Sequence, residues 1–507
     1  MPPSAPQVLL RREVLAAHAP PALDAVQKQV VAHRGGSLRV LGAPGTGKTT
    51  TLVEAVVDRV ERDGLDAGEV LVLAPTRVAA ARLRERVTAR LARTVREPLA
   101  RTPQSFAFGV LRRVAAAADE PAPRLISGPE QDLVLRELLA GHVAGVGARP
   151  QWPHELLPAL ATRGFRGQLR DLVMRAVERG VDPVSLAELG RRHGRPDWVA
   201  AAHVLQEYLD VTALAAPGAY DPASITGAAA AALADDPVLL DEVRAQTRFV
   251  AVDDAHEATP AVAALVRTVV GSAGELLLVG DPDATTQGFR GADPSLLVDG
   301  PGAVVRLRTA WRQGAALRQV TQRVASRIGA VGGAAHRLVT GPTEPRPAGT
   351  AEAHVLRSAT HEASFVAELL RRHHLEHQVP WSQMAVVVRG GSRTSTLRRV
   401  LTAAEVPVDV PATEQPVRDQ AAVVPLLDAF STALALAHGH EHPLDAERAV
   451  ALLTSPLGGA DAVALRRLRR ALRSQELGAV DDAEPGGVVV ARTSDELLVA
   501  ALLDPVL

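Results

Sequence analysis

The stretch LRVLGAPGTGKTT, residues 38–50, organises the rest of this chain. It contains GAPGTGKT, a complete match to the phosphate-binding pattern G-x-x-x-x-G-K-[ST]. Glycines allow the backbone to wrap closely around a phosphate, so that its N–H groups point inward. The lysine supplies a mobile positive charge, and the threonine hydroxyl can bind Mg²⁺. An ordinary glycine-rich turn that matches by chance is the alternative, and the flanking residues disfavour it.

These flanks predict a strand before the loop and a helix after it. Leu38, Val40 and Leu41 form an apolar run that is typical of a buried strand. Apolar residues then recur at helical spacing, namely Leu52, Val53, Val56, Val57 and Val60. A helix that begins at the loop would add the positive end of its dipole to an anion site. Strand, loop and helix therefore agree on a nucleotide-binding P-loop.

The composition permits several domains and excludes few partners. The chain has 507 residues, 47% of them hydrophobic, and its 56 basic residues nearly balance 57 acidic ones. A histone-like polycation is excluded, but a local basic track suffices for nucleic-acid binding. Because the chain has no cysteine, it has neither disulfides nor thiolate metal ligands. The start lacks the pattern of a signal peptide, and no apolar run approaches the length of a membrane span, so we expect a cytoplasmic protein.

Three further apolar segments end in polar residues at the predicted edge of a parallel sheet. Residues 70–73 lead to Thr76, residues 248–252 lead to Asp253, and residues 276–279 lead to Asp281. Doubly wound sheets bind ligands at this edge, and a carboxylate at the position of Asp253 is suited to Mg²⁺. The long Arg/Leu/Ala-rich stretch between the P-loop and Asp253 reads as helical, and we expect it to be an inserted domain. Phe106 and Phe108 are expected in the core rather than in base stacking.

The motifs, taken in order, resemble those of the superfamily 1 DNA helicases of the UvrD/Rep/RecB type. A helix with Gln27 precedes the P-loop, and three segments follow it: VDDAHE at 252–257, GDPDATTQGFRGA at 280–292 and LRTAWR at 307–312. The resemblance continues to about residue 473, through PVRDQ at 416–420 and LLTSPLGG at 452–459. The last segment is most similar to AdnA-type helicase–nuclease subunits of actinobacteria, which process broken DNA ends.

This resemblance implies an α/β fold of the P-loop NTPase type, with two RecA-like parallel-sheet domains that each carry a helical insertion. The expected first RecA-like domain comprises residues 1–110 and 240–310, with its helical insertion at 111–239. Residues 311–415 are expected to form the N-terminal part of the second RecA-like domain, and 416–507 the start of its incomplete insertion. The family's later motifs do not occur before Leu507, so we expect a fragment of a longer protein.

The implied activity is ATP-driven 3′→5′ translocation along single-stranded DNA, in repair or recombination at double-strand breaks. ATP and Mg²⁺ are the implied cofactors, and the implied partners are single-stranded and forked DNA and a second helicase–nuclease subunit, with no membrane. The implied catalytic residues are Lys48, Asp253, Asp254 and Arg312, with Mg²⁺ held by Thr49 and Asp253. The implied ATP contacts are Gln27, Gly42, Ala43, Pro44, Gly45, Thr46, Gly47, Lys48 and Thr49. The implied DNA contacts are Thr76, Thr102, Ser105, Phe289 and Arg290.

The sequence departs from the family pattern at several positions. Asp254 replaces the catalytic Glu, while Ala284 and His256 each replace a Gln. Asp reaches about 1.5 Å less far than Glu, and base catalysis depends on that reach. We therefore expect a site that binds ATP well and hydrolyses it slowly. The alternatives are a fully active motor in which these changes are neutral, and a non-motor subunit that binds nucleotide while a partner chain pulls the DNA. A small-molecule kinase is disfavoured by the FRGA segment and by Arg312.

Overall fold

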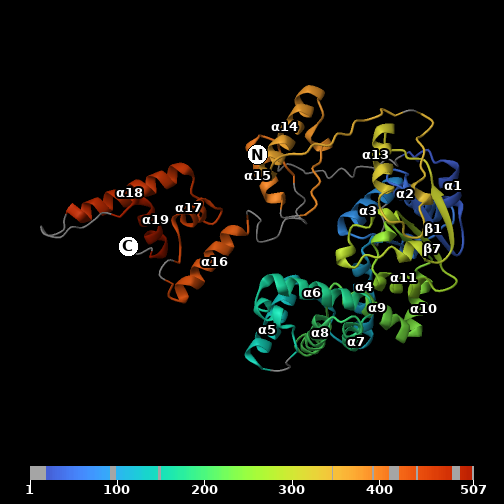
Figure 1. Ribbon diagram of the computed structural model, residues 1–507, viewed down its shortest axis with the longest axis horizontal. Coiled ribbons are helices and arrows are strands. Elements are labelled where there is room, and N and C mark those ends of the chain that lie inside the picture. The colour runs from blue at the N-terminus through green and yellow to red at the C-terminus, as the bar shows by residue number, and fades with distance from the viewer. Residues whose placement is uncertain are drawn as a thin grey trace, which may run out of the picture. The chain divides into compact units, whose positions relative to one another are not determined.

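The computed structural model describes residues 19–91, 99–146, 150–344, 346–390, 393–409, 422–440, 443–481 and 492–504. The chain divides into two compact units, Met1–Glu352 and Ala353–Leu507 (Figure 1). Each unit is described by itself. Within the described ranges, no helix has the length and apolar character needed to cross a membrane.

A parallel sheet forms the centre of the first unit, which confirms the predicted α/β class. In the described residues it has six strands, in the spatial order β3 (Ala100–Arg101), β2 (Val70–Leu73), β6 (Phe249–Val252), β7 (Glu275–Gly280), β1 (Ser37–Gly42) and β8 (Ala303–Leu307). Val40 of β1 lies opposite Val279 of β7 and Val305 of β8. Because every pairing is parallel, all carboxyl ends meet at one edge, where the predicted site residues follow the strands.

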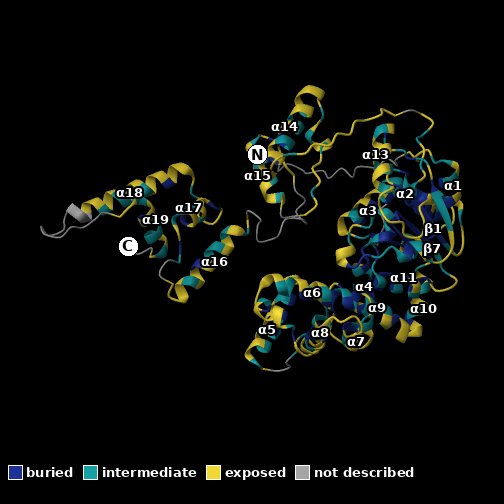
Figure 2. Ribbon diagram, viewed as in Figure 1, coloured by how far each residue is buried: buried dark blue, intermediate teal, exposed yellow. Residues whose placement is uncertain are grey.

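Helices cover both faces of this sheet, so that buried residues gather in the middle layer (Figure 2). One face packs against α1 (Ala25–Ala32), α2 (Lys48–Glu61) and α3 (Arg77–Leu91). The other packs against α4 (Pro103–Ala117), α9 (Ser224–Asp235), α10 (Pro237–Gln246), α11 (Pro260–Val270) and α12 (Ser295–Val298). Strands that are buried on both faces need continuous apolar sequence, which explains the runs at 70–73 and 249–252.

A second core in this unit is entirely helical. It is formed by α5 (Gly128–Ala144), α6 (Arg163–Glu178), α7 (Pro183–Arg192) and α8 (Pro196–Ala215), around Leu135, Val173 and Tyr208. The strands β4 (Arg124–Leu125) and β5 (Ala219–Tyr220) pair in a short parallel ladder. The end of α4 and all of α9 also lie within the expected insertion, 111–239, but both helices bury their apolar faces against the sheet core. The helical core is therefore shorter than the expected insertion.

The chain beyond β8 stays with the first unit as far as Glu352, past the expected boundary at residue 311. It forms α13 (Ala315–Ala325) and the single turn η6 (Ala335–Arg337), and then returns beside the end of β8. There Thr309 pairs with Thr340 in a parallel bridge.

The described residues of the second unit form helices and no strand. These helices are α14 (Ala359–His377), α15 (Thr394–Ala403), α16 (Val424–Ala437), α17 (Ala446–Thr454), α18 (Ala462–Asp481) and α19 (Ser494–Leu503). Residues 379–389, within the expected second RecA-like domain, form no strand, and Val387 is 93% exposed. A strand needs neighbours for its backbone hydrogen bonds, so the second sheet stays a prediction. The PVRDQ segment lies outside the described residues.

Candidate functional site

The P-loop joins β1 to α2 as the sequence predicts. Gly45 and Gly47 have φ angles of 84° and 83°, in the left-handed region that glycine adopts without strain. At Gly42 a side chain would collide with the hydroxyl of Thr46, which donates to the carbonyl of Ala43 at 2.9 Å. Because α2 begins at Lys48, the free N–H groups of its first turn face the loop. The loop therefore forms a cradle with the shape and polarity that an anionic phosphate requires.

The side chain of Lys48 rests on the loop itself. Its Nζ donates to the carbonyl oxygens of Gly42 at 2.8 Å and Ala43 at 3.1 Å. Burial lowers the pKa of Lys48, and the nearby carboxylates, with Asp281 foremost, oppose that shift. Arg312 is close enough to add to the lowering. A phosphate would give this buried ammonium group a stronger partner than two carbonyls.

Thr49 and Asp253 lie together, as expected for a metal site. The hydroxyl of Thr49 is 3.3 Å and 3.2 Å from the two carboxylate oxygens of Asp253, which follows β6 and is buried. Burial, and after it the charge of Asp254, raise the pKa of Asp253 to about 7. A hydroxyl and an otherwise poorly neutralised carboxylate are the oxygen ligands that Mg²⁺ prefers, so these two residues fit that ion.

Asp254 adopts a backbone conformation that is rare for residues other than glycine. Its φ and ψ are both 47°, at the start of the single turn η3 (Ala255–Glu257). Such a conformation costs about 1–3 kcal/mol and is enriched at functional sites. Asp254 lines a small cavity of ≈ 50 Å³ together with Pro75, Gln104 and Glu257. A cavity of this size is large enough for water, which is what a general base at Asp254 would need beside it.

The turn after Asp254 holds the 281–287 segment. His256 is buried, and its Nδ1 accepts a hydrogen bond from the N–H of Asp281 at 3.1 Å. Burial lowers the pKa of His256, which keeps this nitrogen available as an acceptor. The carboxylate of Glu257 accepts from the N–H and hydroxyl of Thr286, at 2.7 Å and 2.8 Å, and from the N–H of Gln287 at 3.0 Å. The metal-side turn and the segment before Phe289 therefore form one hydrogen-bonded assembly.

Gln27 and Trp311 both lie close to Gly47. A Cβ at Gly47 would lie 2.6 Å from Nε2 of Gln27 and 3.5 Å from Cδ1 of Trp311. Gln27 is buried, and its Nε2 donates to the carbonyl of Thr46 at 3.5 Å, while the N–H of Trp311 donates to the carbonyl of Gly45 at 2.8 Å. Sequence reasoning singled out Gln27 but missed Trp311. The signal was an aromatic residue directly before the predicted arginine of LRTAWR.

The base of the Arg312 side chain lies beside the P-loop, within the same compact unit. A Cβ at Gly45 would lie 3.2 Å from Cβ of Arg312. The structure therefore brings together the P-loop, Asp253 and Arg312, three of the parts expected at a triphosphate. The sequence placed Arg312 on a second lobe, across an inter-domain cleft. In the structure it belongs to a segment that packs with the first unit.

The predicted DNA contacts follow three different strands and differ in exposure. Thr76 and Ser105 are exposed, as is Phe289, whose side chain is 67% exposed. Thr102 is buried, and its hydroxyl caps α4 by accepting from the N–H of Ser105 at 3.2 Å. The guanidinium of Arg290 lies 5.3 Å from the ring centre of Phe289. Phe106 and Phe108 pack partly buried against the sheet core, as predicted.

A cluster that sequence reasoning missed lies at the carboxyl end of β7. Nε2 of His336 is 3.0 Å from Oδ2 of Asp283 and 3.5 Å from Oδ1 of Asp281. Arg337 donates two hydrogen bonds to Asp283, at 2.7 Å and 2.6 Å. Two carboxylates and an imidazole are a ligand set for a metal ion. However, Arg337 already neutralises Asp283, so an ion-pair network explains the cluster without a metal.

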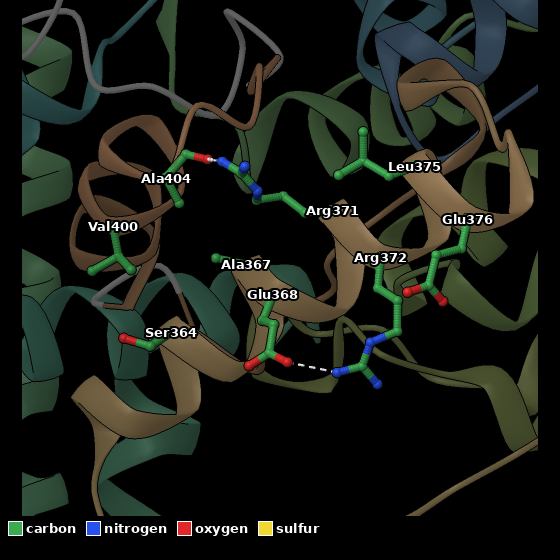
Figure 3. Close-up of a pocket in the computed structure, with 9 residues that line it drawn as sticks. All are labelled: Ser364, Ala367, Glu368, Arg371, Arg372, Leu375, Glu376, Val400 and Ala404. Atoms are coloured by element: carbon green, nitrogen blue, oxygen red, sulfur yellow. Dashed lines mark hydrogen bonds and ion pairs between the residues drawn. The ribbon is translucent and has the colours of Figure 1, made fainter.

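The second unit carries a groove of ≈ 480 Å³ between α14 and α15 (Figure 3). Arg371 donates to the carbonyl of Ala404 at 2.5 Å, and Arg372 pairs with Glu368 at 2.5 Å. The arginines thus already have partners, and no predicted site residue lies in this groove.

Comparison with known proteins agrees with the geometry of the first unit. The family model of the UvrD/REP helicase N-terminal domain matches residues 23–300. The ATP-dependent DNA helicase UvrD1 of Mycobacterium tuberculosis is 26% identical over 401 residues, which are 76% of this chain and 49% of the relative. UvrD2 of the same organism is 26% identical over 398 residues, 76% of this chain and 55% of the relative. DNA helicase II of Haemophilus influenzae is 22% identical over 397 residues, 76% of this chain and 50% of the relative.

The chain spans about half the length of the curated relatives that it matches. The family match covers more than half of the chain itself and includes the P-loop, Asp253 and the 280–292 segment. On this evidence the chain belongs to the UvrD/REP helicase N-terminal domain family.

Proposed function

We propose that this chain binds ATP with Mg²⁺ and uses it to move along single-stranded DNA, as part of an ATP-dependent DNA helicase. The observation that carries the proposal is the convergence of Lys48, the Thr49–Asp253 pair and Arg312 on one glycine-rich loop. Each contributes a different element that phosphoryl chemistry needs: a mobile cation, a metal ligand set and a second positive charge.

The residues around the P-loop would each have a distinct role in ATP binding and hydrolysis. Lys48 would move from the loop carbonyls to the terminal phosphates, and the loop N–H groups would bind the remaining phosphate oxygens. Mg²⁺, when bound by Thr49 and Asp253, would supply charge neutralisation at the phosphates. Asp254, beside its small cavity, would orient the attacking water. An aromatic ring and an amide close to Gly47 suit a purine base, so we assign Trp311 and Gln27 to adenine.

DNA contact would occur where the strands end. Phe289 is an exposed aromatic ring that can stack on a base, with Arg290 beside it to contact phosphate. Thr76 and Ser105 offer exposed hydroxyls after β2 and β3. Glu257 ties the metal-side turn to the segment before Phe289, which gives a physical route from hydrolysis to the DNA. The 3′→5′ polarity and the role in double-strand break repair rest on the resemblance to the helicase family.

A second candidate function is a nucleotide-binding subunit that does not drive movement itself, in a heterodimer of the AdnA type. The observation that favours it is Ala284, whose methyl side chain cannot form a hydrogen bond to a terminal phosphate. In that case ATP would stabilise the complex, and a partner subunit would pull the DNA. The expected extent of the domains, including a second RecA-like sheet, stays part of the proposal.

Lys48→Ala tests the proposal with a matched control inside the chain. The only other lysine, Lys28, is exposed on α1. Lys28→Ala therefore removes the same amino group at a position outside the P-loop. We expect Lys48→Ala to lower DNA-stimulated ATP turnover at least about a hundredfold, as for removal of a preorganised transition-state contact, and Lys28→Ala to change it little. Equal turnover in both variants would refute the phosphate role of the loop. If Lys48→Ala abolishes ATP turnover but its complex with a partner subunit still unwinds DNA as before, the second candidate, a subunit without motor activity, would be favoured.

A further inference from the structure

The segment that carries Trp311 and Arg312 is held by a neighbouring stretch of chain. The N–H of Ala310 donates to the carbonyl of Thr340 at 2.8 Å, and the N–H of Thr340 donates to the carbonyl of Arg308 at 2.8 Å. Residues 335–340 therefore return beside residues 308–310, immediately before the predicted arginine. An interaction that holds residues 335–340 in place therefore also holds the backbone from which Arg312 extends toward the P-loop.

His336 and Arg337, on this returning stretch, are bonded to the carboxyl end of β7. His336 is 2% exposed and contacts both Asp281 and Asp283, while Arg337 holds Asp283 through two hydrogen bonds. Burial pushes the pKa of Asp283 upward, but the bonds from Arg337 and His336 outweigh it, so that the net shift is downward. The bonds to a charged carboxylate in turn raise the pKa of Arg337.

This anchor reaches into the nucleotide site. Asp281 is the carboxylate that acts most strongly on the charge of Lys48. Its N–H is bonded to His256, so both the side chain and the backbone of Asp281 are fixed. On the other side of the site, the N–H of Trp311 is bonded to the carbonyl of Gly45. The segment that carries Arg312 is thus attached at two places, the P-loop and the end of β7.

We propose that His336 and Arg337 are positioning residues, which hold the segment of Trp311 and Arg312 against the phosphate-binding loop through Asp281 and Asp283. The proposal rests on the proposed function for the role of Arg312. It does not rest on it for the anchoring itself, which is measurable without nucleotide. A bidentate Arg–carboxylate pair combined with a buried imidazole defines both direction and distance, which a surface ion pair does not.

Amide hydrogen exchange tests the anchoring directly. We expect Arg337→Ala and the nearly isosteric Asp283→Asn to raise the exchange rate of the Trp311 amide at least about tenfold, because local opening becomes easier when the anchor is lost. The control is Arg113→Ala, which breaks the exposed 2.7 Å pair of Arg113 with Glu242 in the same unit and should leave Trp311 unchanged. Unchanged exchange at Trp311 in Asp283→Asn, which leaves no cavity, would overturn the proposal.

Turnover then separates positioning from general destabilisation. Misplacement by about 1 Å can cost about a hundredfold in rate, so we expect Arg337→Ala to lower kcat by about ten- to a hundredfold. ATP binding should weaken as well, because the same segment carries Trp311. Arg337→Lys should restore part of kcat. In an Arg312→Ala background, Arg337→Ala should cost less than about twofold more, since the two act in series. Additive losses would overturn the proposal. If the parent shows no turnover, the proposed function fails, while the exchange measurement still decides the anchoring.

Discussion

Glu178 places a carboxyl group where the helical core meets the turn that carries Phe289 and Arg290. The residue is 8% exposed and pairs with Arg175 at 2.9 Å, and any side chain at Gly291 would collide with its carboxylate. Burial raises the pKa of Glu178 to about 7, although Arg175 opposes the shift. We predict that Glu178→Gln removes a pH-dependent loss of stability from the protein.

The sign follows from the two states of the carboxyl group. Its pKa in the unfolded chain is near the ordinary 4.5, so the folded protein binds this proton more tightly. The stability that the protonated carboxyl contributes is complete below pH 4.5 and is lost as the pH rises through 7. Each pKa unit corresponds to about 1.4 kcal/mol, which sets an upper limit of about 3 kcal/mol. Allowing for solvent screening at this contact, we expect about 1–3 kcal/mol.

Urea unfolding of the parent and of Glu178→Gln, at steps from pH 4.5 to 8.5, measures this effect. The free energy of unfolding of the variant, relative to the parent, should increase by that amount up to pH 7 and then stay level. Loss of the Arg175 pair adds an offset that does not depend on pH. Glu188→Gln, at an exposed position of the same helical core, should show a flat difference. A flat or falling difference for Glu178→Gln would refute burial as the dominant cause.

Three further changes test the site. Asp254→Glu should raise DNA-stimulated ATP turnover by roughly tenfold because the longer side chain reaches the attacking water; no gain would show that Asp254 does not limit the chemistry. Gly47→Ala should weaken ATP binding about tenfold in a titration with fluorescent ATP, because both its φ of 83° and the nearness of Gln27 oppose a side chain. Gly64→Ala, at a φ of 69° in open space, should change ATP binding little. Phe289→Ala should weaken single-stranded DNA binding by about 1–3 kcal/mol in fluorescence anisotropy, and unchanged affinity would remove Phe289 from the DNA surface.

The strands that sequence reasoning found are those with two buried faces. In β1, β2, β6 and β7 nearly every residue is buried, so each strand is visible as an apolar run. By contrast, β3 has only two residues, and β8 lies at an edge of the sheet with partly exposed residues, so neither has such a signal. The spatial order of the strands depends on pairings between distant residues, which local pattern does not encode.

The same distinction applies to the site. The P-loop is contiguous, so its geometry could be predicted from eight residues. The Asp283–Arg337 pair joins residues that are 54 positions apart, and no spacing rule links them. The sequence also carried no sign of the left-handed backbone conformation of Asp254, because Asp is common in turns of many other conformations. Trp311 was visible as a residue but not as a neighbour of Gly47, since that contact depends on how the chain returns after β8.

Three of the departures from the family pattern carry different weight once their surroundings are known. His256 is no loss of function in itself, because its Nδ1 is a buried acceptor that fixes the backbone of Asp281. Ala284 lacks the polar side chain of the family's Gln, and its N–H already donates to the carbonyl of Asp281 in the turn. Asp254 keeps its carboxylate but is shorter than Glu and starts from a strained backbone that already orients it. The expectation of slow hydrolysis therefore rests on Ala284 and on the reach of Asp254, whereas His256 supports the segment that leads to Phe289.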